Sequence, residues 1–402
     1  MSVRNPIRFT YLIRKATISV AFLFIFWALP LNVFSQESDT PMTDQFFKGL
    51  WVIRNNMTDS SSIKEVVEFA SDNGFRQILV QVRGRGFAYY TSSFVPRSYL
   101  ITEPQFDPLA YAIEKGHEAG LEVHAWMNMY VLWTAETEPP DPNHLLLTQP
   151  EWTDADNNGV MYKDKDWNLF RNGLRGGIYL APTHPAVNPY LKSVVKEVVE
   201  NYNVDGIHLD YIRYQNVVSG YNPAGRETFR NKYGVDPLLL SQITQLDTVN
   251  WDERSYQIYI DAWNAHRRDQ VTQLVSSLKT LCEQHGTKLS AAVKPNVNDA
   301  RSRFFQDWEY WIEEGYLDLA IPMNYAKDLE LFMSNLQLIR EKLPRDQVAM
   351  GIAVYNQSQF DVAEKILKTL SAQYEGFCLF SYNSFVENPT YIDVIRRFVK
   401  IE

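Results

Sequence analysis

The feature that most constrains the fold of this chain is a regular alternation of short β-rich segments with amphipathic helical stretches from residue 48 onward. Such alternation is typical of a parallel sheet covered by helices. Helical stretches are expected at 60–73, 108–119, 186–202, 254–285 and 307–314. The β-rich segments, each short enough for a buried strand, are 49–54, 77–83, 122–128, 206–211, 288–294, 317–324, 348–355 and 376–382.

The number of β-rich segments selects one architecture. Eight strands joined by covering segments are what a closed barrel requires. An open doubly wound sheet would need fewer units and a glycine-rich phosphate-binding turn, which the sequence lacks. The sequence therefore predicts an α/β fold, a single (β/α)8 TIM barrel in one domain at residues 48–402, with long βα loops after strands 3 and 4.

The first 35 residues have the composition of a secretory signal peptide. Four cations, at positions 4, 8, 14 and 15, precede an apolar run from residue 16 to residue 31, and the run 33–35 offers a cleavage site before Gln36. A retained membrane anchor is the alternative, although an apolar run of this length is short for a membrane span. We expect a signal peptide at 1–35, a lead-in at 36–47, and a secreted or periplasmic protein without stable membrane insertion.

The charge of the remaining chain argues against some partners. Removing the four signal-peptide cations from 39 Lys and Arg leaves 35 against 48 Asp and Glu, a formal charge of −13. No clustered basic segment remains, so nucleic acid is not expected as a partner. The two cysteines are Cys282, in a helical pattern, and Cys378, in an apolar strand. We expect two buried free thiols rather than a disulfide.

Two long insertions follow the third and fourth predicted strands, at 129–185 and 212–253. Long loops in compact domains are usually functional or disordered, and disordered segments lack the aromatic residues found here. Because loops after barrel strands lie on the catalytic face, both insertions are expected to wall a cleft. Substrate-facing tryptophans are expected within the first insertion, which contains Trp133, Trp152 and Trp167. In contrast, Trp51, Trp308 and Trp311 are expected in the shell or core.

Asp210 is the strongest catalytic candidate. It ends the fourth predicted strand, in which Ile207 and Leu209 alternate with His208 and Asp210, so the two polar side chains share one face. A carboxylate at the C-terminal end of a barrel strand can act as a nucleophile or as a proton donor or acceptor. The alternative is a structural aspartate that pairs with Arg213 or another cation.

Further polar and aromatic residues lie near the ends of several predicted strands. Aromatic rings stack on the apolar faces of sugars while planar polar groups bind hydroxyls, so this mixture favours a polysaccharide or oligosaccharide substrate. Packing or ion pairing is the alternative role for such residues. Those expected to bind the substrate are Arg83, His124, Trp126, Asn128, His208, Arg213, Tyr214, Asn324, Tyr325 and Tyr382.

Many of these residues lie in motifs that resemble the glycosyl hydrolase-like 10 family of bacterial envelope proteins. The resemblance implies a (β/α)8 glycosidase whose acidic residue in the fourth strand is Asp210. It also implies bacterial cell-wall glycan stripped of its peptides as the leading substrate class. The motifs are LVQVRGRGFAYY (79–90), HAWMNMY (124–130), PEW (150–152), YLAPTHP (179–185), DGIHLDYIRY (205–214), LAIPMNY (319–325) and GFCLFSYNS (376–384).

Two features depart from this expectation. Family members commonly have Asp after VRGRG, where this chain has Phe87. Glycosidases also need two carboxyl groups, about 5–5.5 Å apart for retention and about 6.5–9.5 Å apart for inversion. The end of the fifth predicted strand supplies no acid, and the sequence selects no second carboxylate. The candidates are Glu136, Asp154, Asp156, Asp164, Asp166 and Glu227.

Three functions therefore remain open from the sequence. They are hydrolysis of cell-wall glycan, hydrolysis of another exported polysaccharide, and glycan binding without catalysis. Phe87 and the unassigned second carboxylate are the reasons to keep the third. No spaced cluster of His, Cys, Asp or Glu is evident, so neither a metal nor an organic cofactor is implied.

Overall fold

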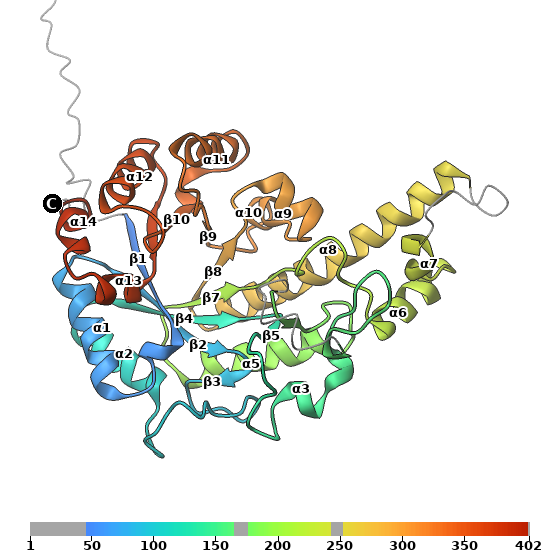
Figure 1. The fold of residues 1–402 in the computed structure, drawn as a ribbon, viewed down its shortest axis with the longest axis horizontal. Helices are drawn as coiled ribbons and strands as arrows, with labels where there is room; N and C mark the ends of the chain where they lie inside the picture. The colour runs from blue at the N-terminus through green and yellow to red at the C-terminus, as the bar shows by residue number, and fades with distance from the viewer. Residues whose placement is uncertain (1–45, 165–175, 243–251, 401–402) are drawn as a thin grey trace, which may run out of the picture. The chain divides into compact units, whose positions relative to one another are not determined.

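The computed structural model describes residues 46–164, 176–242 and 252–400, which form a barrel of parallel strands surrounded by helices (Figure 1). Each of the eight predicted strand segments overlaps one barrel strand, so the predicted barrel is confirmed. The predicted signal peptide and Trp167 lie outside the described residues. The barrel strands are β1 (Phe47–Val52), β2 (Gln77–Gly84), β4 (Glu122–Asn128), β7 (Gly206–Asp210), β8 (Lys288–Val293), β9 (Leu319–Pro322), β10 (Ala349–Ala353) and β11 (Gly376–Phe380).

Neighbouring barrel strands pair in the order β10, β11, β1, β2, β4, β7, β8, β9, and the paired strands are parallel. Between β9 and β10, isolated parallel bridges join Ala320 to Val348 and Met323 to Gly351, so the barrel nearly closes. The order follows the chain once around the barrel because each strand–helix unit adds its strand beside the previous one. The carboxyl ends of all eight strands therefore open to the same side.

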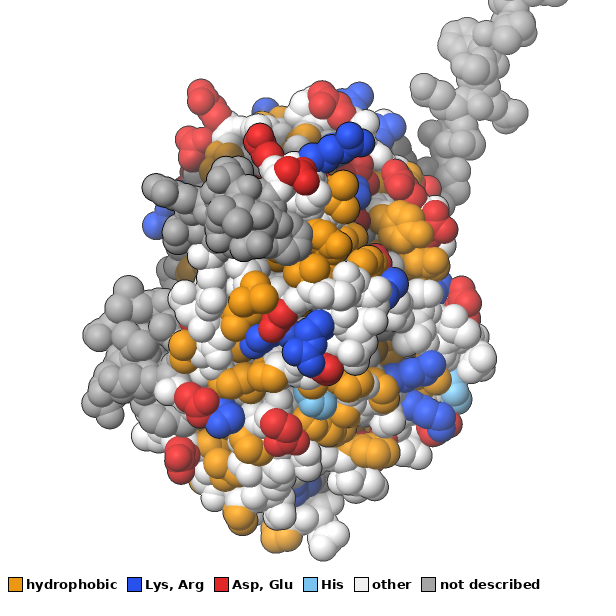
Figure 2. All heavy atoms as spheres, turned by 90° about the vertical axis from the view of Figure 1, so that its right-hand side faces the viewer, with side chains coloured by type: hydrophobic (Ala, Val, Ile, Leu, Met, Phe, Trp, Pro, Cys, Tyr) orange, Lys and Arg blue, Asp and Glu red, His pale blue; other side chains and the backbone are white. Residues whose placement is uncertain are grey.

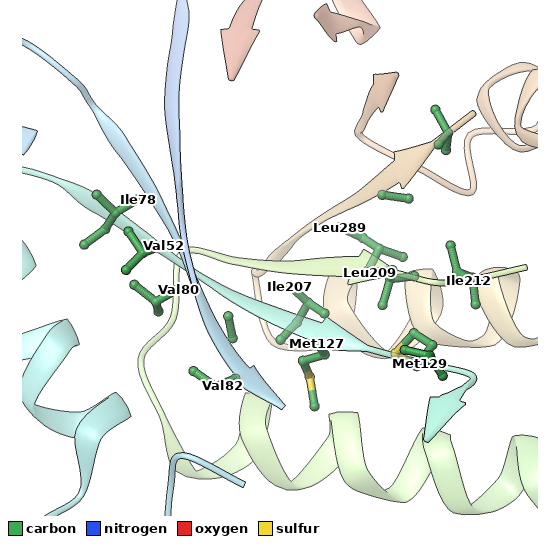
Figure 3. Packing of buried hydrophobic residues seen from close by; sticks show 14 of the residues in the cluster. Val52, Ile78, Val80, Val82, Met127, Met129, Ile207, Leu209, Ile212 and Leu289 are labelled. Carbon is green, nitrogen blue, oxygen red and sulfur yellow. The ribbon is translucent and has the colours of Figure 1, made fainter. Parts of the chain in front are cut away.

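The strands present one face to the barrel interior and the other to the helices. On β7, Ile207 and Leu209 belong to the large hydrophobic cluster outside the barrel, which also contains Val80 of β2 (Figure 3). A smaller cluster that includes Trp51 and Trp126 fills the interior. Because side chains alternate along a strand, the polar residues between Ile207 and Leu209 and at the end of β7 point inward.

Helices cover the outside of the barrel, and several begin at side-chain caps. Asp59, Asp107 and Asp328 each accept a hydrogen bond from a backbone N–H in the first helical turn, and Ser358 forms a capping box with Asp361. All five predicted helical stretches are observed. The main helices are α1 (Ser60–Asp72), α2 (Pro108–Glu118), α5 (Val187–Asn201), α8 (Glu253–Gln284), α10 (Trp308–Glu313), α11 (Leu329–Lys342), α12 (Gln359–Ser371) and α14 (Tyr391–Val399).

The two insertions contain more regular structure than the sequence indicates. The first holds an antiparallel pair, β5 (Val131–Trp133) and β6 (Ile178–Tyr179), and the short helix α3 (Leu145–Thr148). The second holds α6 (Pro223–Tyr233) and α7 (Pro237–Gln242), which lie beside the part of α8 that extends past the barrel (Figure 1). Three further short elements are β3 (Phe87–Ala88), α9 (Val297–Arg303) and α13 (Tyr382–Glu387).

The surface and the thiols bear on two of the expectations above. Cys282 and Cys378 are both buried free thiols, as predicted. Within the described ranges, the helices are too short or too polar to cross a membrane. On the face shown in Figure 2, basic side chains are scattered among acidic and apolar ones rather than gathered in one area.

Candidate active site

A cleft of about 640 Å³ opens at the C-terminal ends of the barrel strands. This volume lies within the range typical of small-molecule sites. Most of its lining comes from the last residues of the strands and the first residues of the loops that follow them. The polar and aromatic residues that line it are Trp51, Arg54, Gln81, Arg85, Trp126, Asn128, Thr134, Asp210, Tyr211, Arg213, Lys294, Asn324, Tyr325, Asn335 and Phe380.

Asp210 lies on the wall of this cleft, with 7% of its surface exposed. Its Oδ2 accepts a hydrogen bond from Trp126 Nε1 at 3.2 Å, and its Oδ1 accepts one from the Tyr211 backbone N–H at 2.7 Å. Tyr211 has a φ of +51°, and so does Arg85 across the cleft lining. Left-handed backbone at non-glycine residues is strained and concentrates at functional sites.

The environment of Asp210 changes its acidity. Burial raises its pKa from the ordinary value of 3.8 to about 6. The hydrogen bonds from Tyr211 and Trp126, together with the charges of Arg213 and Lys294, favour the carboxylate and limit this rise. A carboxyl group with a pKa near 6 populates both protonation states around neutral pH, so it is suited to donate or accept a proton.

A row of amide and guanidinium groups crosses the floor of the cleft. Gln81 Oε1 accepts hydrogen bonds from the backbone N–H and from NH1 of Arg54, at 3.2 and 3.1 Å. Gln81 Nε2 donates to Asn128 Oδ1 at 3.2 Å. Gln81 and Asn128 belong to the neighbouring strands β2 and β4, and Arg54 follows the end of β1. Together the three side chains present planar hydrogen-bonding groups of the kind that bind sugar hydroxyls.

An aromatic wall stands on another side of the cleft. Tyr325 stacks on Phe380 with ring centroids 5.5 Å apart and an interplanar angle of 29°. Trp51 meets Tyr325 edge-on at 6.5 Å and Phe380 at 5.9 Å. The Trp51 indole is held from below because its Nε1 donates to His208 Nε2 at 3.0 Å. The wall is therefore fixed in place before any ligand binds.

The cleft has an excess of positive charge. Arg54, Arg85, Arg213 and Lys294 line it, whereas Asp210 is the sole acidic side chain among the described lining residues. The arginines donate to neutral groups, such as Thr134 Oγ1 for Arg85 at 2.8 Å. Arg213 lies between the rings of Tyr211 and Phe304, at 5.1 and 5.3 Å, and Lys294 lies 4.6 Å from the Phe304 ring centre. Burial and the charge of Arg213 lower the pKa of Lys294 to about 8.

The structure brings six of the predicted site residues to the cleft. They are Trp126, Asn128, Asp210, Arg213, Asn324 and Tyr325. Asn324 is fully buried and uses its amide within the protein, because its Nδ2 donates to Phe332 O and its Oδ1 accepts from Asn335 Nδ2. Its position in the wall is therefore structural in the free protein, whereas the other five present atoms toward the cleft.

Three further predicted residues do not line the cleft. Two of them lie inside the barrel, whereas Arg83 lies on its outer side, because a bulge in β2 pairs Arg83 with the outward-facing Met127. His208 and His124 point inward, as the alternation predicts, but occupy lower positions on their strands. His208 is fully buried between Trp51 and Ser290, and burial lowers its pKa far below the ordinary value. His124 lies about 13 Å below Asn128 by strand rise and contacts Glu122 and Phe47. Arg83 is 1% exposed and braces β2 to β4, since its guanidinium donates to the Asn128 and Met129 carbonyls.

Two further predicted residues lie outside the barrel. Tyr214 is 1% exposed and packs edge-on against Phe305, because the chain turns away from the cleft directly after Arg213. Tyr382 begins α13, and its ring packs against Phe69 of α1 rather than facing the strand ends. Tyr214 lies past the predicted end of its strand at residue 211, whereas the strand predicted at 376–382 extended past Phe380, where β11 ends.

Several residues of the cleft were absent from the sequence-based prediction. They include Gln81, Arg54, Lys294 and Phe380, whose one signal in the sequence is a position at or near the end of a strand. Trp51 is buried in the core cluster inside the barrel, as predicted, and it also lines the cleft. Trp308 and Trp311 are fully buried, as predicted.

The two insertion tryptophans that the structure describes, Trp133 and Trp152, do not face the cleft. Trp133 is 2% exposed and donates from Nε1 to Thr137 O, and Trp152 packs against His184 and Tyr190. They stabilise the first insertion, and the cleft takes its tryptophans from the strands instead. Among the described residues of the two insertions, those that line the cleft lie near the strand ends, including Val131 and Thr134 of the first.

The candidates for the second carboxylate do not line the cleft within the described residues. Asp154 is buried away from the cleft, and burial raises its pKa to about 7. Asp164 and Glu227 form exposed ion pairs with Lys163 and Arg230. Glu136 and Asp156 also lie away from it, and Asp166 lies outside the described residues.

Phe87 does not face the cleft either. It packs among Tyr99, Trp133 and His144, with ring centroids 5.0 to 6.1 Å away. Its side chain therefore belongs to the core of the β3 hairpin. No cluster of three or more metal-binding side chains occurs among the described residues.

The comparison with known families agrees with this geometry. The sequence profile of the glycosyl hydrolase-like 10 family matches residues 47–368. The chain belongs to this family. Glycosyl hydrolase YngK of Bacillus subtilis strain 168 is 23% identical over 285 residues, which cover 68% of this chain and 51% of YngK. Glycosyl hydrolase DigH of Escherichia coli K12 is 28% identical over 270 residues, which cover 63% of this chain and 55% of DigH. The chain therefore spans about half the length of these relatives.

Solved structures share the fold of this family member. The glycoside hydrolase domain of PgaB (BpsB) from Bordetella bronchiseptica has a TM-score of 0.65 at 10% identity, covering 89% of this chain and 99% of that domain. The catalytic domain of β-amylase from Paenibacillus polymyxa has a TM-score of 0.57 at 14% identity, covering 89% of this chain and 98% of that domain. At these identities the likeness shows a shared barrel fold.

Proposed function

We propose that this family member hydrolyses the glycan strands of bacterial peptidoglycan, with Asp210 as a catalytic carboxylate. The observation that carries the proposal is the position of Asp210. It is buried at the end of a barrel strand, in a cleft whose other polar groups are neutral or cationic. Membership of a glycosyl hydrolase-like family supports the reaction class.

The proposed role of Asp210 is proton transfer at the glycosidic oxygen. A carboxyl group with a pKa of about 6 is protonated in an appreciable fraction of molecules near neutral pH and can protonate the leaving oxygen. Trp126 and the Tyr211 N–H then stabilise the carboxylate that remains. In the overall reaction a water oxygen replaces the leaving oxygen on the anomeric carbon, and one water proton makes good the proton that Asp210 gave to the leaving oxygen.

The proposed substrate follows from the lining of the cleft. Stacked rings and amide groups suit sugar rings and hydroxyls, and the four cations suit a glycan that also carries carboxylates. Peptidoglycan strands stripped of their peptides present such carboxylates on the lactyl groups of their muramic acid units. Cleavage of the signal peptide predicted at 1–35 would place the enzyme in the compartment where these strands occur.

The test is turnover of peptide-free glycan strands by the purified protein, followed as new reducing ends. Asp210→Asn is expected to lower turnover by about 10²- to 10⁴-fold, the usual contribution of a positioned acid or base. Glu227→Gln is the matched control, because it removes an exposed carboxylate outside the cleft. Turnover by the folded Asp210→Asn variant equal to that of the wild-type protein would contradict a catalytic role for Asp210.

The same experiment separates the two other functions. Binding of the strands without any new reducing ends would favour a glycan-binding barrel. Turnover of a different exported polysaccharide, with none of peptidoglycan strands, would keep the reaction and change the substrate.

A further inference from the structure

The aromatic wall of the cleft continues outward through Tyr355. This residue follows β10 and is 58% exposed, yet its ring meets two rings of the wall edge-on. The centroids of Tyr355 and Tyr325 are 6.4 Å apart at 86°, and those of Tyr355 and Phe380 are 6.1 Å apart at 79°. Tyr325 and Phe380 line the cleft, whereas Tyr355 lies just beyond it.

The segment that carries Tyr355 is anchored from beneath. Lys365 of α12 is 1% exposed, and its Nζ donates to the carbonyls of Ala326 and Lys327 at 2.7 and 2.9 Å and also to Gln357 Oε1. One buried cation therefore joins two loops. The loop after β9 contains Tyr325, and the loop after β10 contains Tyr355. In addition, Tyr391 donates from its hydroxyl to the Gln357 carbonyl.

These contacts distinguish Tyr355 from an ordinary exposed aromatic side chain. Single exposed apolar residues are common and need no function. This ring is instead held edge-on by a rigid aromatic pair, in continuity with the cleft, with most of its surface free. Leu331, which lines the cleft and is 55% exposed, extends the same apolar rim. A large ring kept exposed and supported in this way suits the apolar face of a sugar.

We propose that Tyr355 forms a sugar-stacking subsite beyond the central cleft, so that the protein engages several consecutive units of a glycan chain. This inference rests on the proposed function, because it assigns a chain-length preference to the same site. Tyr355 is a specificity-determining residue in this scheme and takes no part in bond cleavage.

The test is a series of peptide-free peptidoglycan oligosaccharides with two, four, six and eight sugar units. Tyr355→Ala is expected to lower kcat/KM about 5- to 10-fold on the longest substrates, the range of one aromatic contact, and to leave the shortest cleaved substrate unaffected. Tyr355→Phe keeps the ring and is expected to rescue most of the loss. Tyr310→Ala is the matched control, since Tyr310 is a partly exposed tyrosine of α10 that packs edge-on against Tyr316.

An equal loss on every chain length, or no loss on any, would overturn the subsite. Tyr355→Leu and thermal unfolding of each variant check that the effect comes from the lost ring face rather than from a disturbed loop.

Calorimetric binding of the same oligosaccharides to Asp210→Asn, with and without Tyr355→Ala, separates this inference from the proposed reaction. Weaker binding of long chains alone in the double variant supports the subsite even if no substrate is cleaved, and unchanged binding rejects it. Absence of binding to any of the oligosaccharides rejects both proposals.

Discussion

At the scale of single residues, the acidity of Asp210 results from two groups close to it in the chain, Tyr211 and Arg213, and from two distant ones, Trp126 and Lys294. Its hydrogen-bond donors come from β4 and from the residue that follows β7, and its nearest cations come from the loops after β7 and β8. Burial works against the carboxylate while these groups work for it. The balance leaves a pKa of about 6, which is the chemically useful property of the side chain.

The raised pKa of Asp210 predicts a pH-dependent cost in stability. In the unfolded chain its pKa is near 3.9, so the folded state binds the proton more tightly, and this contribution is lost as pH rises through about 6. Between pH 4 and pH 8, wild-type protein should lose up to about 3 kcal/mol of unfolding free energy from this group. Asp210→Asn should lack that loss. Urea unfolding at several pH values measures it, and parallel pH curves for the two proteins would contradict the prediction.

Lys294 is expected to set part of this acidity. Its charge favours the Asp210 carboxylate, so Lys294→Met should raise the pKa of Asp210 further. The limb of the pH–rate profile assigned to Asp210 should move upward by about half a pH unit. Lys368→Met, which changes an exposed lysine of α12, provides the control. A limb that stays in place in the Lys294 variant would show that Asp210 does not control the rate.

At the scale of elements, single buried cations hold neighbouring segments together. Arg83 joins β2 to the end of β4, and Lys365 joins the loops after β9 and β10. Each donates to backbone carbonyls at the end of a strand or in the loop that follows it. A buried carbonyl without a partner is costly, so these side chains fix the strand ends and loops that shape the cleft.

Lys365→Met should therefore destabilise the fold by about 2–3 kcal/mol, because it leaves the Ala326 and Lys327 carbonyls without their donor. Binding of long oligosaccharides should weaken as well, since Tyr355 loses its anchored position. Denaturant unfolding and calorimetric binding measure the two effects. Lys342→Met, which breaks a more exposed ion pair with Glu309, should cost less than about 1 kcal/mol. Equal costs for the two variants would argue against the anchoring role.

At the scale of the whole molecule, the barrel interior and the surrounding shell form a continuous packed structure. Cys378 lies inside the barrel and Cys282 lies between α8 and the sheet. Burial raises the pKa of both thiols, that of Cys282 to about 12. Cys378 therefore probes the packing inside the barrel, and Cys282 probes the packing between the helices and the sheet.

Both thiols should consequently resist a water-soluble disulfide reagent in the native protein and react together on unfolding. The measurement is the rate at which the reagent releases its chromophore on reaction with the protein thiols, with and without denaturant. Ser302→Cys, at an exposed position of α9, provides a thiol that reacts at once. Rapid reaction of one native thiol would show that its layer opens independently of the other.

The sequence by itself determined the order and type of the elements and the position of the leading carboxylate. Strand and helix periods are local properties, so eight β-rich segments and five helical stretches were readable before any contact was known. The same alternation placed Asp210 on the inner face at the end of β7. Family motifs independently pointed to the same residue.

Only the tertiary structure decided which inward-facing residues reach the cleft. His124 and His208 share the inner face with Asn128 and Asp210 but lie lower on their strands, and height in the barrel depends on the register between strands. Trp51, Arg54, Gln81, Lys294 and Phe380 converge because the curved sheet brings the ends of four strands, β1, β2, β8 and β11, to one mouth. That convergence depends on contacts between residues far apart in the chain, and a local pattern does not encode such contacts.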